Sequence, residues 1–198
     1  MDVNVEGLLK SKNEIRFLDD RRNRINLARE MLEDSFETHF SAKVNHLYGP
    51  KFQRNLDHLE MLLELSLMLA NSLPDITLRI ARNELLPEGV LKERDVSYKS
   101  IRANLSDGAV KEAIETLHSS AESDYIRAAC NTLKHRQLIR VKTTLNSSGF
   151  YGPVLQSFVY DGKEFQERKW TEVFSAIDDS YSRVVEVVAA ISNSVRTL

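Results

Sequence analysis

The chain has 198 residues, of which 42% are hydrophobic and 28% are charged, which is typical of a soluble globular protein and excludes a disordered one. Its formal net charge of -2 excludes a general attraction to nucleic acid, so contact with RNA requires a local basic patch. Only 7 glycines and 4 prolines interrupt it, which favours long helices. We predict a mainly α single domain over residues 1–198: a bundle of four to six helices with a small β-hairpin or meander at 138–167 before the last helix.

Two long stretches with helical periodicity open the chain. Residues 12–48 contain no glycine or proline and repeat apolar residues at helical intervals, so we expect one long helix that ends at Gly49–Pro50. The charged run at 19–24 is expected to be its solvated face. A second helix is expected at 52–72, where leucines nearly encircle the sequence and indicate a central position in the bundle.

Residues 73–106 have the weakest periodicity of the chain. Pro74 can begin a short helix that runs through Arg82, and Pro87–Gly89 is a turn signal. The segment 90–104 is expected to be a connector with a short helix.

A further helix is expected to end at Ser119 and to be capped by Ser106 or Asp107. We interpret Ser119 and Ser120 as caps and not as a hydrolase nucleophile beside His118, because the sequence has no strand-to-helix nucleophile turn there.

Alternating apolar and polar residues at 138–145 predict a strand. Turn residues at 146–149 precede a returning strand at 154–160. Asp161–Gly162 is a hairpin signal, so a third short strand is expected around 164–166.

Residues 170–195 have a broad apolar face and are expected to form the last helix of the bundle. Asp178 and Asp179 are adjacent, and neighbouring helix residues point about 100° apart, so we expect solvated carboxylates and not a catalytic or metal-binding pair. The single cysteine, Cys130, is expected to be a small core residue.

The sequence predicts no cofactor and no membrane contact. It has no glycine-rich phosphate loop, and its longest apolar stretch, Met61–Ala70, is far shorter than the roughly 20 residues that span a bilayer. The N-terminus has no apolar segment of the secretory kind, so we expect a cytoplasmic protein. No metal site is expected, because three histidines that might be grouped lack ligand spacing: His39, His46 and His58.

The stretch from Asp124 to Ile139 carries the densest polar chemistry. Arg127, Asn131 and His135 stand at i, i+4 and i+8, on one face of a helix. A histidine placed there can act as a general acid or base, a carboxamide can orient it or a phosphate, and Arg127 or Lys134 can stabilise negative charge. Metal-free RNA cleavage needs these three functions: a base for the 2′-hydroxyl, a cation for the negative charge that develops, and a group that holds the scissile phosphate. Alternatively, the same side chains hydrogen-bond to neighbouring elements and form a structural polar layer.

Basic residues near the end of this helix are candidates for contact with RNA or a protein partner, although exposed cations more often serve solubility. They are Lys134, Arg136, Arg140 and Lys142.

The run Asn131-Thr132-Leu133-Lys134-His135-Arg136, late in a mostly helical chain, resembles the HEPN superfamily, particularly divergent members with a Lys-His-Arg ending followed by strands. The resemblance implies a helical bundle that often dimerises and frequently acts as a metal-independent RNase in bacterial defence or toxin systems. The family signature is an arginine, commonly followed by asparagine, and then a histidine four to six residues after the arginine. Asn131 and His135 match the Asn-x-x-x-His part, Cys130 stands where the arginine is expected, and Arg127 lies outside the usual spacing.

The leading hypothesis is therefore a dimeric RNA-processing protein, with His135 as acid or base, Asn131 orienting, and Arg127 or Lys134 contacting phosphate. One alternative is a noncatalytic HEPN-like module that binds RNA or a protein through the same face. Another is a small-molecule sensor that uses the interior of the bundle.

Overall fold

A computed structural model describes the chain at residues 8, 10–36, 50–134, 141–146 and 149–196, and describes only the backbone at 50–53, 141–146 and 149–152. Over these residues the protein is a helical bundle with two small sheets inserted before the C-terminal helix. The predicted fold class is confirmed.

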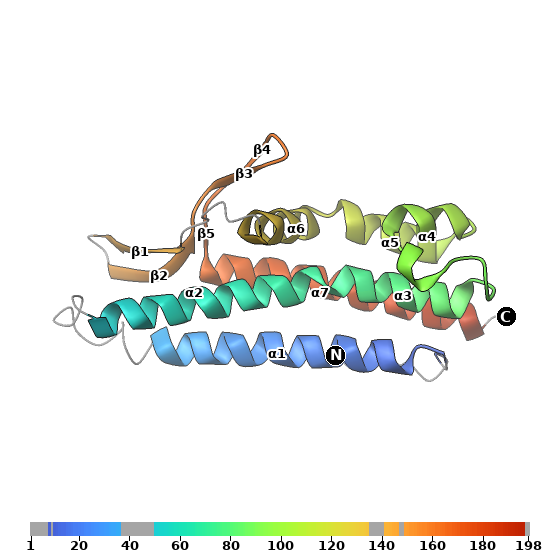
Figure 1. Ribbon diagram of the computed structural model, residues 1–198, viewed down its shortest axis with the longest axis horizontal. Helices are drawn as coiled ribbons and strands as arrows, with labels where there is room; N and C mark the ends of the chain where they lie inside the picture. The colour runs from blue at the N-terminus through green and yellow to red at the C-terminus, as the bar shows by residue number, and fades with distance from the viewer. Residues whose placement is uncertain (1–7, 9, 37–49, 135–140, 147–148, 197–198) are drawn as a thin grey trace.

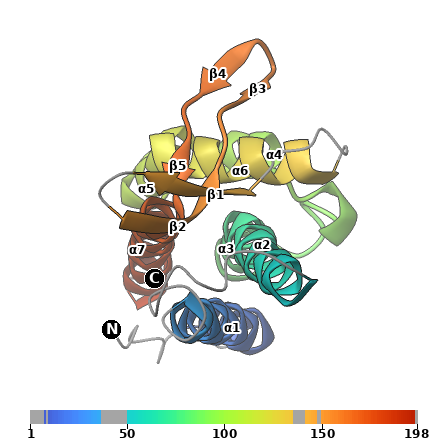
Figure 2. The same ribbon diagram turned by 90° about the vertical axis from the view of Figure 1, so that its left-hand side faces the viewer.

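The helices lie in three layers (Figure 1). One outer layer is a single helix, the middle layer lies between it and the other outer layer, and that other outer layer holds the shorter helices (Figure 2). The single outer helix is α1 (Lys12–Phe36). The middle layer consists of α2 (Pro50–Asn71), α3 (Leu73–Leu85) and α7 (Trp170–Arg196). The other outer layer consists of α4 (Tyr98–Asn104), α5 (Ala109–Ser119) and α6 (Ala121–Lys134).

Helix α1 is amphipathic and buries a narrow stripe. Leu18, Ile25 and Leu32 recur every seven residues on that stripe, and Ala28 lies between them. The helix packs against α2, α3 and α7. The expected continuation through residue 48 falls at 37–49, outside the described residues.

Helices α2 and α3 follow one another nearly in line (Figure 1) and supply much of the core. Leu59, Leu63 and Leu67 of α2 are fully buried, as the leucine-rich pattern predicted. By length and composition alone, Arg54–Leu85 could cross a membrane, but half of its most apolar window is buried inside the fold. The core helix of a soluble protein has the same properties.

The connector after α3 contains more helix than the periodicity indicated. Helix α3 runs to Leu85, and a short 3-10 turn, η3 (Glu93–Asp95), precedes α4. Ser97 begins α4 with a capping box, in which its side chain accepts from the backbone of Ser100. The expected cap of α5 was wrong: Gly108 precedes that helix without a side-chain cap, and Asp107 pairs with Lys111.

The inserted strands form two antiparallel sheets. The returning strand expected at 154–160 is interrupted at residues 156–157, so its two parts belong to different sheets. The hairpin turn at Asp161–Gly162 is confirmed, since both residues have positive φ, as a tight hairpin loop requires. One sheet has the order β1 (Val141–Asn146), β2 (Gly149–Leu155), β5 (Arg168–Lys169), and the other pairs β3 (Phe158–Tyr160) with β4 (Lys163–Phe165).

Asp178 of α7, which was expected at the solvated surface, connects α7 to α1 through ion pairs. Asp178 Oδ1 accepts hydrogen bonds from Arg22 at 2.8 Å and from Arg29 at 2.7 Å. Burial disfavours the charged carboxylate, but the two arginines outweigh that effect and lower the pKa of Asp178. Sequence reasoning placed Asp178 and Arg22 in solvent, because nothing along the chain indicates that residues 156 positions apart meet.

Candidate functional site: the cavity beside α6

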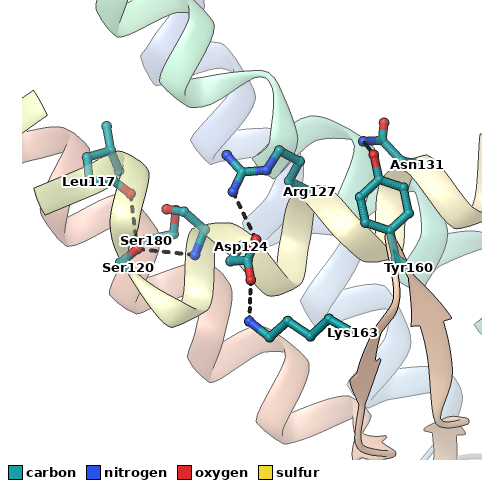
Figure 3. Close-up of polar contacts among 9 residues, drawn as sticks. Leu117, Ser120, Asp124, Arg127, Asn131, Tyr160, Lys163 and Ser180 are labelled. Carbon is teal, nitrogen blue, oxygen red and sulfur yellow. Dashed lines mark hydrogen bonds and ion pairs between the residues drawn. The ribbon is translucent and has the colours of Figure 1, made fainter. Parts of the chain in front are cut away.

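Helix α6 begins with a serine cap. Ser120 Oγ accepts from the backbone nitrogen of Ser123 at 3.2 Å and donates to the carbonyl of Leu117 at 3.1 Å (Figure 3). This confirms the capping interpretation of Ser120. Cys130 is buried, and burial raises the pKa of its thiol, so it is a core residue and not a reactive thiolate.

Two of the predicted site residues, Arg127 and Asn131, line a single cavity of about 190 Å³. They stand one turn apart on α6, as the i, i+4 spacing requires. The cavity lies where the α2–α3 junction meets α5, α6 and α7. Its other walls are Ala70, Asn71, Pro74, Asp75, His118, Ser123, Ile126 and Ser180.

Arg127 is held by a carboxylate within its own helix. Its Nη2 donates to Asp124 Oδ1 at 2.9 Å, and Lys163 of β4 binds the other oxygen of the same carboxylate (Figure 3). Burial opposes the charge of Asp124, but its hydrogen bonds from Lys163 and Arg127 outweigh that effect and lower its pKa. The cluster therefore holds two cations and one carboxylate, and the guanidinium donors of Arg127 that do not bind Asp124 can bind an anion.

Asn131 connects α6 to the β3–β4 hairpin. Its Nδ2 donates to the hydroxyl of Tyr160 at 2.9 Å (Figure 3). The other amide hydrogen and the amide oxygen take no part in this bond. Asn131 therefore anchors the hairpin, as the polar-layer alternative predicts, while it also lines the cavity.

His118, on α5, is a cavity residue that sequence reasoning considered only in a hydrolase pairing. Its ring stacks on Tyr98 with centroids 4.1 Å apart, and its buried Nε2 has no hydrogen-bond partner among the described residues. Burial lowers the pKa of His118, Arg127 lowers it further, and Asp75 opposes both. The imidazole is thus neutral at pH 7 and can accept or donate a proton. No sequence signal links His118 to Arg127, because the link is the packing of α5 on α6.

The remaining predicted site residues divide into one that is described and four whose side chains are not. Lys134 is the exposed last residue of α6. His135, Arg136 and Arg140 lie outside the described residues, and of Lys142 only the backbone, in β1, is described. Their assigned roles remain predictions.

The cavity combines a cation, a neutral imidazole, amides and a carboxylate, a set that can bind a polar ligand and transfer a proton. Among the described residues no group of three or more His, Cys, Asp or Glu side chains could hold a metal ion. No family model matches the chain, and neither a curated protein nor a solved structure matches it.

Proposed function

We propose that this chain is a HEPN-like, metal-independent ribonuclease of a prokaryotic defence or toxin system. The observation that carries the proposal is that Arg127 and Asn131, two of the residues to which it gives a role, line one cavity. The helical fold, with strands between the motif helix and the last helix, agrees with what the resemblance implies.

In this proposal the 2′-hydroxyl of RNA attacks the adjacent phosphorus, the 5′-oxygen leaves, and a 2′,3′-cyclic phosphate forms. His135 takes or supplies the proton, Asn131 orients it or the phosphate, and Arg127 stabilises the charge that develops on the phosphate oxygens. Lys134, Arg136, Arg140 and Lys142 hold the flanking RNA backbone.

The test is cleavage of mixed RNA by the purified chain in EDTA. His135→Ala should lower the rate by about 100-fold or more, the usual minimum for loss of a general acid or base. His58→Ala is the matched control and should cleave at the unaltered rate. Equal cleavage by His135→Ala would remove His135 from the mechanism, and no cleavage of any RNA would remove the ribonuclease proposal.

A second candidate is a noncatalytic HEPN-like module that binds RNA or a protein partner. It is favoured by the internal bonds of Arg127 to Asp124 and of Asn131 to Tyr160, which already engage the two side chains. This candidate predicts that the chain binds RNA or a protein without cleaving RNA. It also predicts that removal of the charge of Lys134 or Arg136 weakens this binding.

We also propose a cytoplasmic homodimer that forms through α1 and α2. Arg22 and Arg29 of α1 point to α7, so the opposite flank of its buried stripe borders α2. Large apolar side chains on that flank and on α2 are 42% to 57% exposed: Phe17, Leu27, Met31, Met61, Leu65 and Met68.

The balance of charges on this face is compatible with a second copy as its partner. Exposed charged residues follow the same stripes, Asp20 and Arg24 on α1 and Arg54 and Asp57 on α2. Asp20 and Arg24 pair with each other at 3.0 Å. Two acids and two bases give no net charge, so two copies meet without net repulsion.

A further inference from the structure

A groove of about 850 Å³ lies at the end of the bundle where α3 and α7 both end (Figure 1). It shares no lining residue with the cavity beside α6. Three segments form it: the end of α3, the turn between α4 and α5, and the C-terminal part of α7. The proposed ribonuclease mechanism gives this groove no role.

Helix α7 forms one long wall of the groove. Its lining residues stand at i, i+3, i+4, i+7 and i+8, so they share one side of the helix: Glu186, Ala189, Ala190, Asn193 and Ser194. Eight residue steps at a rise of about 1.5 Å give a wall roughly 12 Å long, which equals about two turns of a helix. Residues with this spacing are the ones by which a helix contacts another helix that lies along it.

The facing wall of the groove is apolar. Leu85 and Leu86 come from the end of α3, and Leu105 and Val110 come from the two sides of the α4–α5 turn. All four are buried or half-buried, so their positions are set by the core and not by solvent. The two alanines of α7 are too short to fill the space in front of this wall, and apolar side chains of a partner can therefore reach it.

Carboxylates border the groove, and no Lys or Arg is among its described lining residues. Asp107 accepts a hydrogen bond from Lys111 at 2.7 Å, but the Asp107 side chain is 95% exposed, so a further cation can reach it. Glu186 is exposed and has no ion pair among the described residues. The groove therefore favours a partner with cationic side chains over one with anionic side chains.

We propose that this groove binds an amphipathic helix of a partner protein, with its apolar side against α3 and α7 and its Lys or Arg residues beside Glu186 and Asp107. A segment of about two turns fills the length of the α7 wall. A second copy fits less well, because its exposed apolar face on α1 and α2 has no net charge, and the pairing of two unlike faces does not close into a dimer.

The test is selection of a phage-displayed library of random dodecapeptides on the immobilised full chain. Enriched peptides should carry apolar residues at i, i+3 and i+4 together with Lys or Arg. The Ala190→Phe chain, whose added ring occupies the groove, should not enrich them. Ala121→Phe adds the same ring at an exposed residue outside the groove and should enrich the same peptides as the unaltered chain.

Fluorescence anisotropy then measures the affinity of one enriched peptide for charge variants. Glu186→Lys replaces attraction by repulsion and should weaken binding by about tenfold or more. Glu112→Lys makes the same change at an exposed residue of α5 outside the groove and should keep the affinity within about twofold, because solvent and salt screen distant charges. Circular dichroism establishes that each variant is folded. Because Glu186 is exposed, its variant tests the groove even if Ala190→Phe does not fold.

Three results would overturn the proposal: no enrichment, enrichment of peptides without Lys or Arg, or equal affinity of the unaltered and Glu186→Lys chains. Self-association that Glu186→Lys abolishes would assign the groove to a second copy and would overturn it too. None of these results depends on RNA cleavage, so a chain without ribonuclease activity leaves the test intact.

Discussion

The amide nitrogen of Asn131 lies 2.9 Å from the hydroxyl oxygen of Tyr160, and this bond joins the candidate motif helix to the β3–β4 hairpin. On the same hairpin, Lys163 binds Asp124, which in turn holds Arg127. The inserted strands thus determine how the polar face of α6 is presented. A substitution in the hairpin that breaks one of these bonds should therefore alter the positions of Asn131 or Arg127 in the candidate site.

The Asn131–Tyr160 bond should be measurable as a coupling energy. Asn131→Ala and Tyr160→Phe each remove one partner, and a double-mutant cycle in urea should give a coupling of about 0.5–1.5 kcal/mol in the free energy of unfolding. The Asn131→Ala change alone also leaves the Tyr160 hydroxyl without its donor. Strictly additive effects would contradict a stabilising bond between the two residues.

Asp178→Asn should destabilise the protein by about 1–2 kcal/mol, between the values of exposed and buried ion pairs. The change removes the charge that Arg22 and Arg29 share, while both guanidiniums stay near the faces of Tyr181 and Phe174. Asp179→Asn, at the exposed neighbouring position, is the matched control and should change stability little. Urea denaturation that shows equal effects of the two variants would contradict the role of Asp178.

His118 should make the protein lose stability in mild acid. Its pKa is below the ordinary value of 6.5 in the folded chain, so below pH 6.5 the unfolded state takes up a proton first and the free energy of unfolding falls. Asp75, Arg127 and Tyr98 are the neighbouring groups that titrate or carry charge. The lowered pKa values of Asp124 and Asp178 act only below the ordinary 3.8, outside this window.

The measurement is the free energy of unfolding from about pH 7 to pH 5, where a histidine of ordinary pKa begins to protonate. His118→Gln should flatten the loss across this range, and the slope is compared because the substitution also removes the stacking on Tyr98. His58→Gln serves as the histidine control. An identical slope for wild type and His118→Gln would show that His118 does not resist protonation.

Charges placed on the apolar face of α1 and α2 should dissociate the proposed dimer. Leu65→Asp combined with Met61→Asp puts carboxylates where two copies would meet, and light scattering during size-exclusion chromatography should report the mass of one chain. Val90→Asp adds a charge at an exposed apolar residue in the α3–α4 connector and should leave the dimer intact. A wild-type chain that is monomeric at micromolar concentration would remove the dimer proposal.

Local patterns in the sequence determined most of the helices and the hairpin turn. Helix α7 begins at the predicted residue and ends one residue after the predicted end, because its apolar residues keep the period of a buried helix face over its whole length. Ser120 caps α6 for an equally local reason, since its partner Ser123 is three residues away. The break between β2 and β3 was missed, because which sheet a strand joins depends on partners elsewhere in the chain.

The sequence by itself also placed Arg127 and Asn131 on one face, since their spacing alone decides it. Only the tertiary structure brought His118 and Asp75 to that face and turned it into a cavity wall. It likewise took Asp178 out of solvent, against two arginines of α1. Helical spacing determines only which residues within a turn or two share a face. These contacts instead depend on how α1, α3, α5 and α7 pack, and the whole core determines that packing.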